Sequence, residues 1–207
     1  IESGISQIFS IGQTTKKGLV TKLGGNGDVV WEKSYTVSND TDSLEFKKII
    51  QLKQDKPSNS YLYVAYATTG KNHYLICIND KGEVFWTRQF NWDNNLIEVQ
   101  IIASLVDSDF YVSISELIPV KNQPQIVCFD SNGNFVNGQS LPVTQKDFII
   151  SSIDIDLIGI VLAGSFNESD GSHGVVVRLD KNLKLLSTLV LVETDTLIQD
   201  IKIENKD

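Results

Sequence analysis

The chain has no methionine, two cysteines, two histidines and four prolines among its 207 residues. Two cysteines, Cys77 and Cys128, are too few for the disulfide scaffold that small secreted domains use. Apolar runs such as Leu157 to Ala163 are far shorter than the roughly 18 residues of a membrane span. With 41% hydrophobic residues, the chain is expected to fold around an ordinary hydrophobic core.

Positive charge is also scarce, with 18 lysines and arginines against 26 acidic residues and a formal net charge of -8. A surface of this sign repels a phosphate backbone. We therefore expect no nucleic-acid partner.

Helical periodicity is missing as well. No stretch of ten or more residues keeps a 3.6-residue apolar period, and all four prolines fall between strand-like segments. Because proline interrupts a sheet ladder, this placement marks loops between strands. The sequence predicts an all-β domain.

A hairpin pattern repeats four times without gaps. Each copy reads as strand, tight turn and strand, and equivalent positions are 55, 51 and 50 residues apart. The copies are KLGGNGDVVW from Lys22, CINDKGEVFW from Cys77, CFDSNGNFVN from Cys128 and RLDKNLKLLS from Arg178. Gly27, Gly82 and Gly133 stand where the turn needs a positive φ, and Leu183 takes that place in the last copy.

Two further apolar strands accompany each hairpin. The first ends in small residues and comes just before the hairpin: SQIFSIG from Ser6, YLYVAYA from Tyr61, DFYVSIS from Asp109 and IGIVLAG from Ile158. The second is an alternating run: LEFKKIIQL from Leu44, NLIEVQIIASL from Asn95, DFIISSIDI from Asp147 and TLIQDIKI from Thr196. Each repeat therefore contains four strands.

Four-stranded units with a period near 50 residues are typical of β-propeller blades, which must stack because one blade cannot bury both faces. A β-sandwich with accidental internal similarity is the alternative. We expect one propeller domain over residues 1–207. Its blades are residues 1–35 with 196–207, then 44–90, 95–141 and 147–191.

The two ends of the pattern complement each other. The chain opens with three strands of one unit and closes with the single run from Thr196. If that run pairs beside Ser6 to Gly12, the C-terminal strand completes the first blade and closes a four-bladed ring. The chain also begins at Ile1, without methionine, inside a strand-like pattern, so a fragment of a larger propeller is the alternative.

The segment GIVLAGSFNESDGSHGVVVRLDKN from Gly159 and the hairpins ending at Trp31 and Trp86 resemble the repeats of bacterial surface and secreted β-propellers. Those repeats carry a KLD-x-x-G-x-x-x-W hairpin. The chain is more distantly similar to the tryptophan-docking blades of quinoprotein-like propellers and outer-membrane assembly lipoproteins. Asn137 and Ser187 replace the tryptophan in the last two copies, so the resemblance implies a propeller fold and no single function.

The most ligand-like cluster follows the second hairpin. Phe90 and Trp92 are followed by Asp93 and Asn94, and aromatic faces beside polar side chains suit contacts with a protein or a sugar. Packing of Phe90 between blades, with Trp92 as a lone surface aromatic, is the alternative interpretation.

Other candidate chemistry has simpler explanations. Asp154, Asp156 and Glu98 could pair for glycoside hydrolysis. Asp154 and Asp156 could equally line a solvated channel. His73 and His173 are expected in exposed loops with no second His or Cys at a ligand spacing. The two cysteines are expected to be free thiols, since equivalent strands of adjacent blades lie too far apart for a disulfide.

These observations favour a non-enzymatic protein-interaction or scaffold module of a secreted, cell-surface or assembly protein. No catalytic residue, metal site or cofactor is expected. A carbohydrate-binding propeller and a glycoside hydrolase are the alternatives, so the partner is expected to be a protein, or else a glycan.

Overall fold

The computed structural model describes residues 8–14, 16–37, 42–52, 61–70, 72–90, 97–105, 109–116, 124–141, 148–191 and 197–203. These residues form β-strands and turns, and no helix occurs among them. It follows that no described helix could cross a membrane. The prediction of an all-β chain is confirmed.

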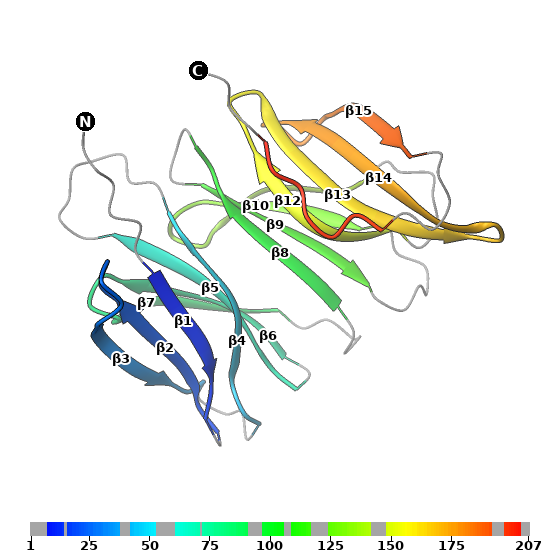
Figure 1. The fold of residues 1–207 in the computed structure, drawn as a ribbon. Coiled ribbons are helices and arrows are strands. Elements are labelled where there is room, and N and C mark those ends of the chain that lie inside the picture. The colour runs from blue at the N-terminus through cyan, green and yellow to red at the C-terminus, as the bar shows by residue number, and fades with distance from the viewer. Residues whose placement is uncertain are drawn as a thin grey trace. The chain divides into compact units, whose positions relative to one another are not determined.

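The strands form four antiparallel sheets (Figure 1). The first contains β1 (Ile8–Gln13), β2 (Gly18–Leu23) and β3 (Val29–Tyr35). The second contains β4 (Glu45–Gln51), β5 (Leu62–Thr69), β6 (Asn72–Asn79) and β7 (Val84–Phe90). The third contains β8 (Ile97–Ala103), β9 (Phe110–Glu116), β10 (Gln125–Phe129) and β11 (Phe135–Ser140). The fourth contains β12 (Ile149–Ile155), β13 (Gly159–Glu168), β14 (Gly171–Asp180) and β15 (Leu185–Val190).

Within every sheet the strands pair in chain order, so each sheet is a simple meander. The chain divides into two compact units, of which the first comprises residues 1–51 and 57–95 and the second residues 52–56 and 96–207. Sheets one and two pack together in the first unit, and sheets three and four in the second.

The last hairpin of each sheet has the same turn. Gly27, Gly82, Gly133 and Leu183 have φ angles of 88°, 71°, 71° and 68°, as the repeat predicted. The ladder shifts register beside each turn, for example between Cys77 and Ile78. A three-residue turn that ends in a left-handed residue and a bulge explains both features.

The hydrophobic core follows the strand pattern. In the first unit the buried side chains come from β2 to β6 and include Phe46, Tyr63 and Ile78. Gly18 lets the two sheets approach, because a Cβ there would lie 2.6 Å from the ring of Phe46. The core of the second unit is mostly aliphatic and includes Ile126, Leu162 and Leu179.

The C-terminal segment differs from the expectation. Residues 197–203 are not in a strand, and the first sheet has three described strands. The segment instead binds β12: the Ser151 hydroxyl donates to the carbonyl of Ile198, and the N–H of Ile201 donates to Ser152 Oγ at 3.2 Å. Side chains of β12 thus satisfy part of this backbone, and within the described part of the chain the first sheet has three strands.

Candidate functional site

Of the predicted contact cluster, only Phe90 lies within the described residues. It is the last residue of β7, it is half-buried, and it pairs across the sheet with His73. Trp92, Asp93 and Asn94 lie outside the described residues. The cluster therefore remains a prediction.

The three carboxylates considered for hydrolysis have structural partners. Asp156 follows β12, accepts the N–H groups of Ile158 and Gly159 at 2.8 Å, and forms an ion pair with Arg178. Burial acts to raise the pKa of Asp156, but those N–H groups and Arg178 outweigh it, and the net shift is downward. This carboxylate is anionic and fixes the turn between β12 and β13.

Asp154 and Glu98 are also engaged. Asp154 accepts the N–H of Ile155 at 2.8 Å and that of Ile203 in the C-terminal segment. Glu98 accepts a hydrogen bond from Gln100 at 2.6 Å. Each carboxylate thus holds a neighbouring group of the fold.

The two histidines do not lie in exposed loops, and that expectation was wrong. His73 lies in β6 and His173 in β14, and both are buried. Each ring stacks on the aromatic residue of the preceding strand, with ring centroids 6.0 Å apart for Tyr66 and His73 and 5.3 Å apart for Phe166 and His173. Cross-strand stacking removes each imidazole from water.

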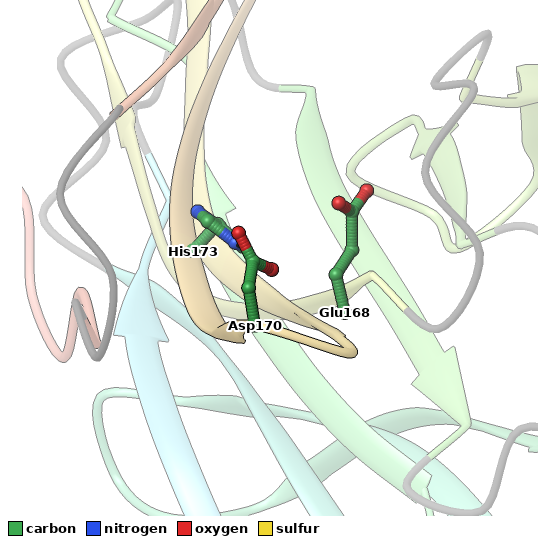
Figure 2. A group of neighbouring side chains, drawn as sticks. All are labelled: Glu168, Asp170 and His173. Carbon is green, nitrogen blue, oxygen red and sulfur yellow. The ribbon is translucent and has the colours of Figure 1, made fainter.

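His173 belongs to a cluster at the end of the β13–β14 hairpin. Figure 2 shows Glu168, Asp170 and His173 side by side there, and one ligand atom from each lies within 4.8 Å of the others. Asp170 Oδ1 is 3.0 Å from His173 Nε2. The two carboxylates are exposed and the imidazole is buried. The cluster therefore combines two acidic side chains at the surface with an imidazole that is held inside the sheet.

The contacts within the cluster shift the pKa values of its members. The hydrogen bond with Asp170 raises the pKa of His173 above its usual value, and the backbone of Leu191 adds a further hydrogen bond to the imidazole. The same contact lowers the pKa of Asp170. Both shifts favour the charged forms of Asp170 and His173, so the imidazole holds its proton more firmly than usual.

Sequence reasoning missed this cluster. The spacing Glu168-x-Asp170-x-x-His173 contains no second histidine or cysteine, and it is not a known ligand spacing on one strand. The hairpin reverses the chain between Glu168, which pairs with Gly171, and His173, which pairs with Phe166. Only that register brings the three groups to one side.

Neither cysteine forms a disulfide, as predicted, and both are buried. Burial raises the pKa of Cys77 to about 12. Since a thiolate is the reactive form, this residue is inert at neutral pH.

Exposed apolar side chains recur on the outer strands. The first two residues of β3, β7 and β11, and the second residue of β15, are between 48% and 66% exposed: Val29, Val30, Val84, Phe85, Phe135, Val136 and Leu186. Among the described strands, each of these stands at the end of its sheet and pairs with one neighbour. We call these residues, a pair in each of the first three sheets and Leu186 in the fourth, the outer-strand pairs.

Comparisons with known proteins include a distant likeness of structure. No family model matches the chain, and no curated protein matches it. The crystal structure of BBS1N in complex with ARL6DN, soaked with lead, is similar with a TM-score of 0.41 and 12% sequence identity, over 97% of this chain and 71% of that chain.

Proposed function

We propose that this chain is a non-enzymatic interaction module that binds a protein partner through its outer strands. The observation that carries the proposal is the set of outer-strand pairs, in which apolar residues stay exposed at equivalent positions of all four sheets. Apolar side chains left exposed in this way offer contact area to a partner.

The backbone of these strands supports the same conclusion. A strand with one neighbour leaves the N–H and C=O groups of its other edge available, and an extended peptide can pair with them. Side chains such as Val84 and Phe85, exposed by 52% and 62%, then supply apolar contact beside the new ladder. A protein segment meets both requirements.

The chemistry of the pairs favours a protein over a glycan. Five of the seven residues are valine or leucine, and the two aromatics are Phe85 and Phe135, which have no polar group for a sugar hydroxyl. Sugars are bound by aromatic faces together with polar side chains. A carbohydrate-binding module is the second candidate and depends on the cluster from Phe90 to Asn94.

We further propose that the four sheets are blades of one β-propeller in a secreted, cell-surface or assembly protein. Support comes from the repeated hairpin and from the packing of one meander on the next within each unit. Native mass spectrometry with small-angle scattering tests the ring: a compact monomer is expected. A dimer or an elongated particle would favour a larger ring to which this chain contributes blades.

The binding experiment uses two variants that each replace two exposed apolar residues. V84T/F85T alters an outer strand, whereas L157T/I158T alters the turn between β12 and β13, where Leu157 and Ile158 are 71% and 62% exposed. Proteins captured by the intact chain are purified, and their affinities for both variants are measured directly.

At least a tenfold loss of affinity in V84T/F85T, with no loss in L157T/I158T, is the expected result. Equal affinities for both variants would refute the outer-strand surface. Binding on a glycan array that Trp92→Ala abolishes, without any protein partner, would support the carbohydrate-binding alternative.

A further inference from the structure

We propose that Glu168, Asp170 and His173 form a binding site for a divalent transition-metal ion such as Zn²⁺ at the end of the β13–β14 hairpin. The inference is independent of the proposed partner binding. It starts from the three donor atoms within 4.8 Å of one another (Figure 2).

The imidazole is already placed as a ligand. His173 is 8% exposed, its ring stacks on Phe166, and it hydrogen bonds to the backbone of Leu191, which follows β15 outside the hairpin. Metal-bound histidines are commonly held in this way, with one nitrogen on the metal and the ring fixed by a backbone carbonyl. Because Nε2 faces Asp170, the ring presents that nitrogen to the carboxylates.

The carboxylates can complete the site with small movements. In a tetrahedral zinc site with bonds of about 2.0 Å, neighbouring ligand atoms are roughly 3.4 Å apart. Asp170 Oδ1 and His173 Nε2 are closer than this, at 3.0 Å. Glu168 and Asp170 are exposed, so their side chains can rotate to admit the ion between the three donors.

The donor set favours a particular class of ion. One nitrogen and two carboxylate oxygens suit Zn²⁺ and its neighbours in the first transition series, whereas Ca²⁺ and Mg²⁺ take oxygen ligands. Three protein ligands leave at least one position for water or for a group from another molecule. The site would therefore bind more weakly than a closed four-ligand centre.

The test is a calorimetric titration of the chelator-treated full chain with Zn²⁺, supported by NMR of the histidine side chains. We expect one Zn²⁺ per chain, and His173 resonances that move while those of His73 stay in place. Glu168→Gln and Asp170→Asn should each weaken binding at least tenfold. These exposed residues can be changed without touching the core.

Glu83→Gln is the matched control, because Glu83 is an exposed carboxylate beside another hairpin turn, where it accepts a hydrogen bond from Asn79 at 2.8 Å. Its affinity for Zn²⁺ should equal that of the unmodified chain. The proposal is overturned if Zn²⁺ does not bind, if the His173 resonances do not move, or if E168Q and D170N bind as tightly as E83Q.

Discussion

The two units join neighbouring sheets at equivalent positions with different chemistry. In each unit the last strand of one sheet reaches the hairpin turn of the next. The Trp31 indole donates to the carbonyl of Asp80 at 2.9 Å, and the Asn137 amide donates to the carbonyl of Asn182 at 3.1 Å. Trp31 and Asn137 hold the same position in the repeat, so one contact is made by a large side chain and the other by a small one.

The first unit uses polar and aromatic groups at this junction. Asp80 forms an ion pair with Lys22 and accepts the hydroxyl of Tyr63 at 3.1 Å. The hydroxyl of Tyr35 donates to the carbonyl of Gly82 at 2.9 Å. Burial and the neighbouring Asp80 raise the pKa of Tyr63, and burial raises the pKa of Tyr35 to about 12, so both phenols are protonated donors.

The second unit uses aliphatic packing at the equivalent positions. Cys128 replaces Lys22 and Leu141 replaces Tyr35. Both are buried in one cluster with Leu183, which replaces Gly82 and is fully buried. Apolar contacts in the second unit thus stand where the first unit has hydrogen bonds and an ion pair.

The exchange is balanced in volume. A Cβ on Gly82 would lie 3.0 Å from the indole of Trp31 and 2.9 Å from Lys33, so a side chain at this turn position is crowded where tryptophan covers the turn. With Asn137 in place of Trp31, a leucine can occupy the turn position. Leu183 tolerates its φ of 68° because its burial offsets a strain of about 1 kcal/mol.

The largest effect should come from removing the leucine of the second unit. Leu183→Ala keeps the Cβ but empties part of a fully buried site, and we expect a loss of about 3 kcal/mol in the free energy of unfolding. Urea denaturation measures it. Lys181→Ala, an exposed residue of the same turn, serves as the control, and equal losses for the two variants would mean that Leu183 does not support the junction.

A double-mutant cycle tests the volume exchange itself. Trp31→Asn and Gly82→Leu should each destabilise the chain. The first removes the indole that packs on the turn, and the second crowds Lys33 and the indole. Together they recreate the pair found in the second unit, so the combined loss should be smaller than the sum by about 1 kcal/mol. Strict additivity in urea denaturation would contradict the compensation.

The repeat explains how far the fold could be read from the sequence. The strands could be predicted from the alternation of apolar residues, and the turn at Gly82 from the glycine itself. The turn at Leu183 could be predicted only because the repeat aligns without gaps. The contacts of the segment after Thr196 could not be predicted in this way. Its alternating pattern suits a sheet ladder, but Ser151 and Ser152 of β12 hold part of its backbone by side-chain hydrogen bonds. The cluster at His173 was missed because it depends on hairpin register.

The ion pairs of the two units also differ, because only that of the first unit connects neighbouring sheets. Lys22 and Asp80 join two sheets, whereas Arg178 and Asp156 lie within one sheet. Asp156→Asn keeps an acceptor for the two N–H groups but removes the charge beside Arg178, and a loss of about 1 to 2 kcal/mol is expected at pH 7.

The pH dependence of this loss has a definite sign. The pKa of Asp156 is lowered on folding from 3.8, so its contribution is present above that value and disappears as the pH falls through the folded pKa. The difference in stability between the parent chain and Asp156→Asn should therefore shrink in acid. A difference that stays constant from pH 7 to pH 3 would show that the charge has no role.

The smallest effect separates the two histidines, one in each unit. Both stack on a cross-strand aromatic residue, but His73 Nδ1 faces the hydroxyl of Tyr66 at 2.7 Å, while His173 faces Asp170. Burial lowers the pKa of His73 below 6.5, and the carboxylate raises that of His173 above it. An NMR titration in chelator should therefore show His173 titrating at higher pH than His73.

These opposite pKa shifts give the two histidines opposite effects on how stability depends on pH. His173 contributes below pH 6.5 and loses its contribution as the pH rises through its raised pKa. Neutral His73 contributes above pH 6.5 and loses its contribution as the pH falls from 6.5 through its lowered pKa. Asp170→Asn should lower the pKa of His173 and leave that of His73 unchanged. If both histidines titrate together in the parent chain, the carboxylate does not control His173, and the difference between the two stacked pairs is one of shape alone.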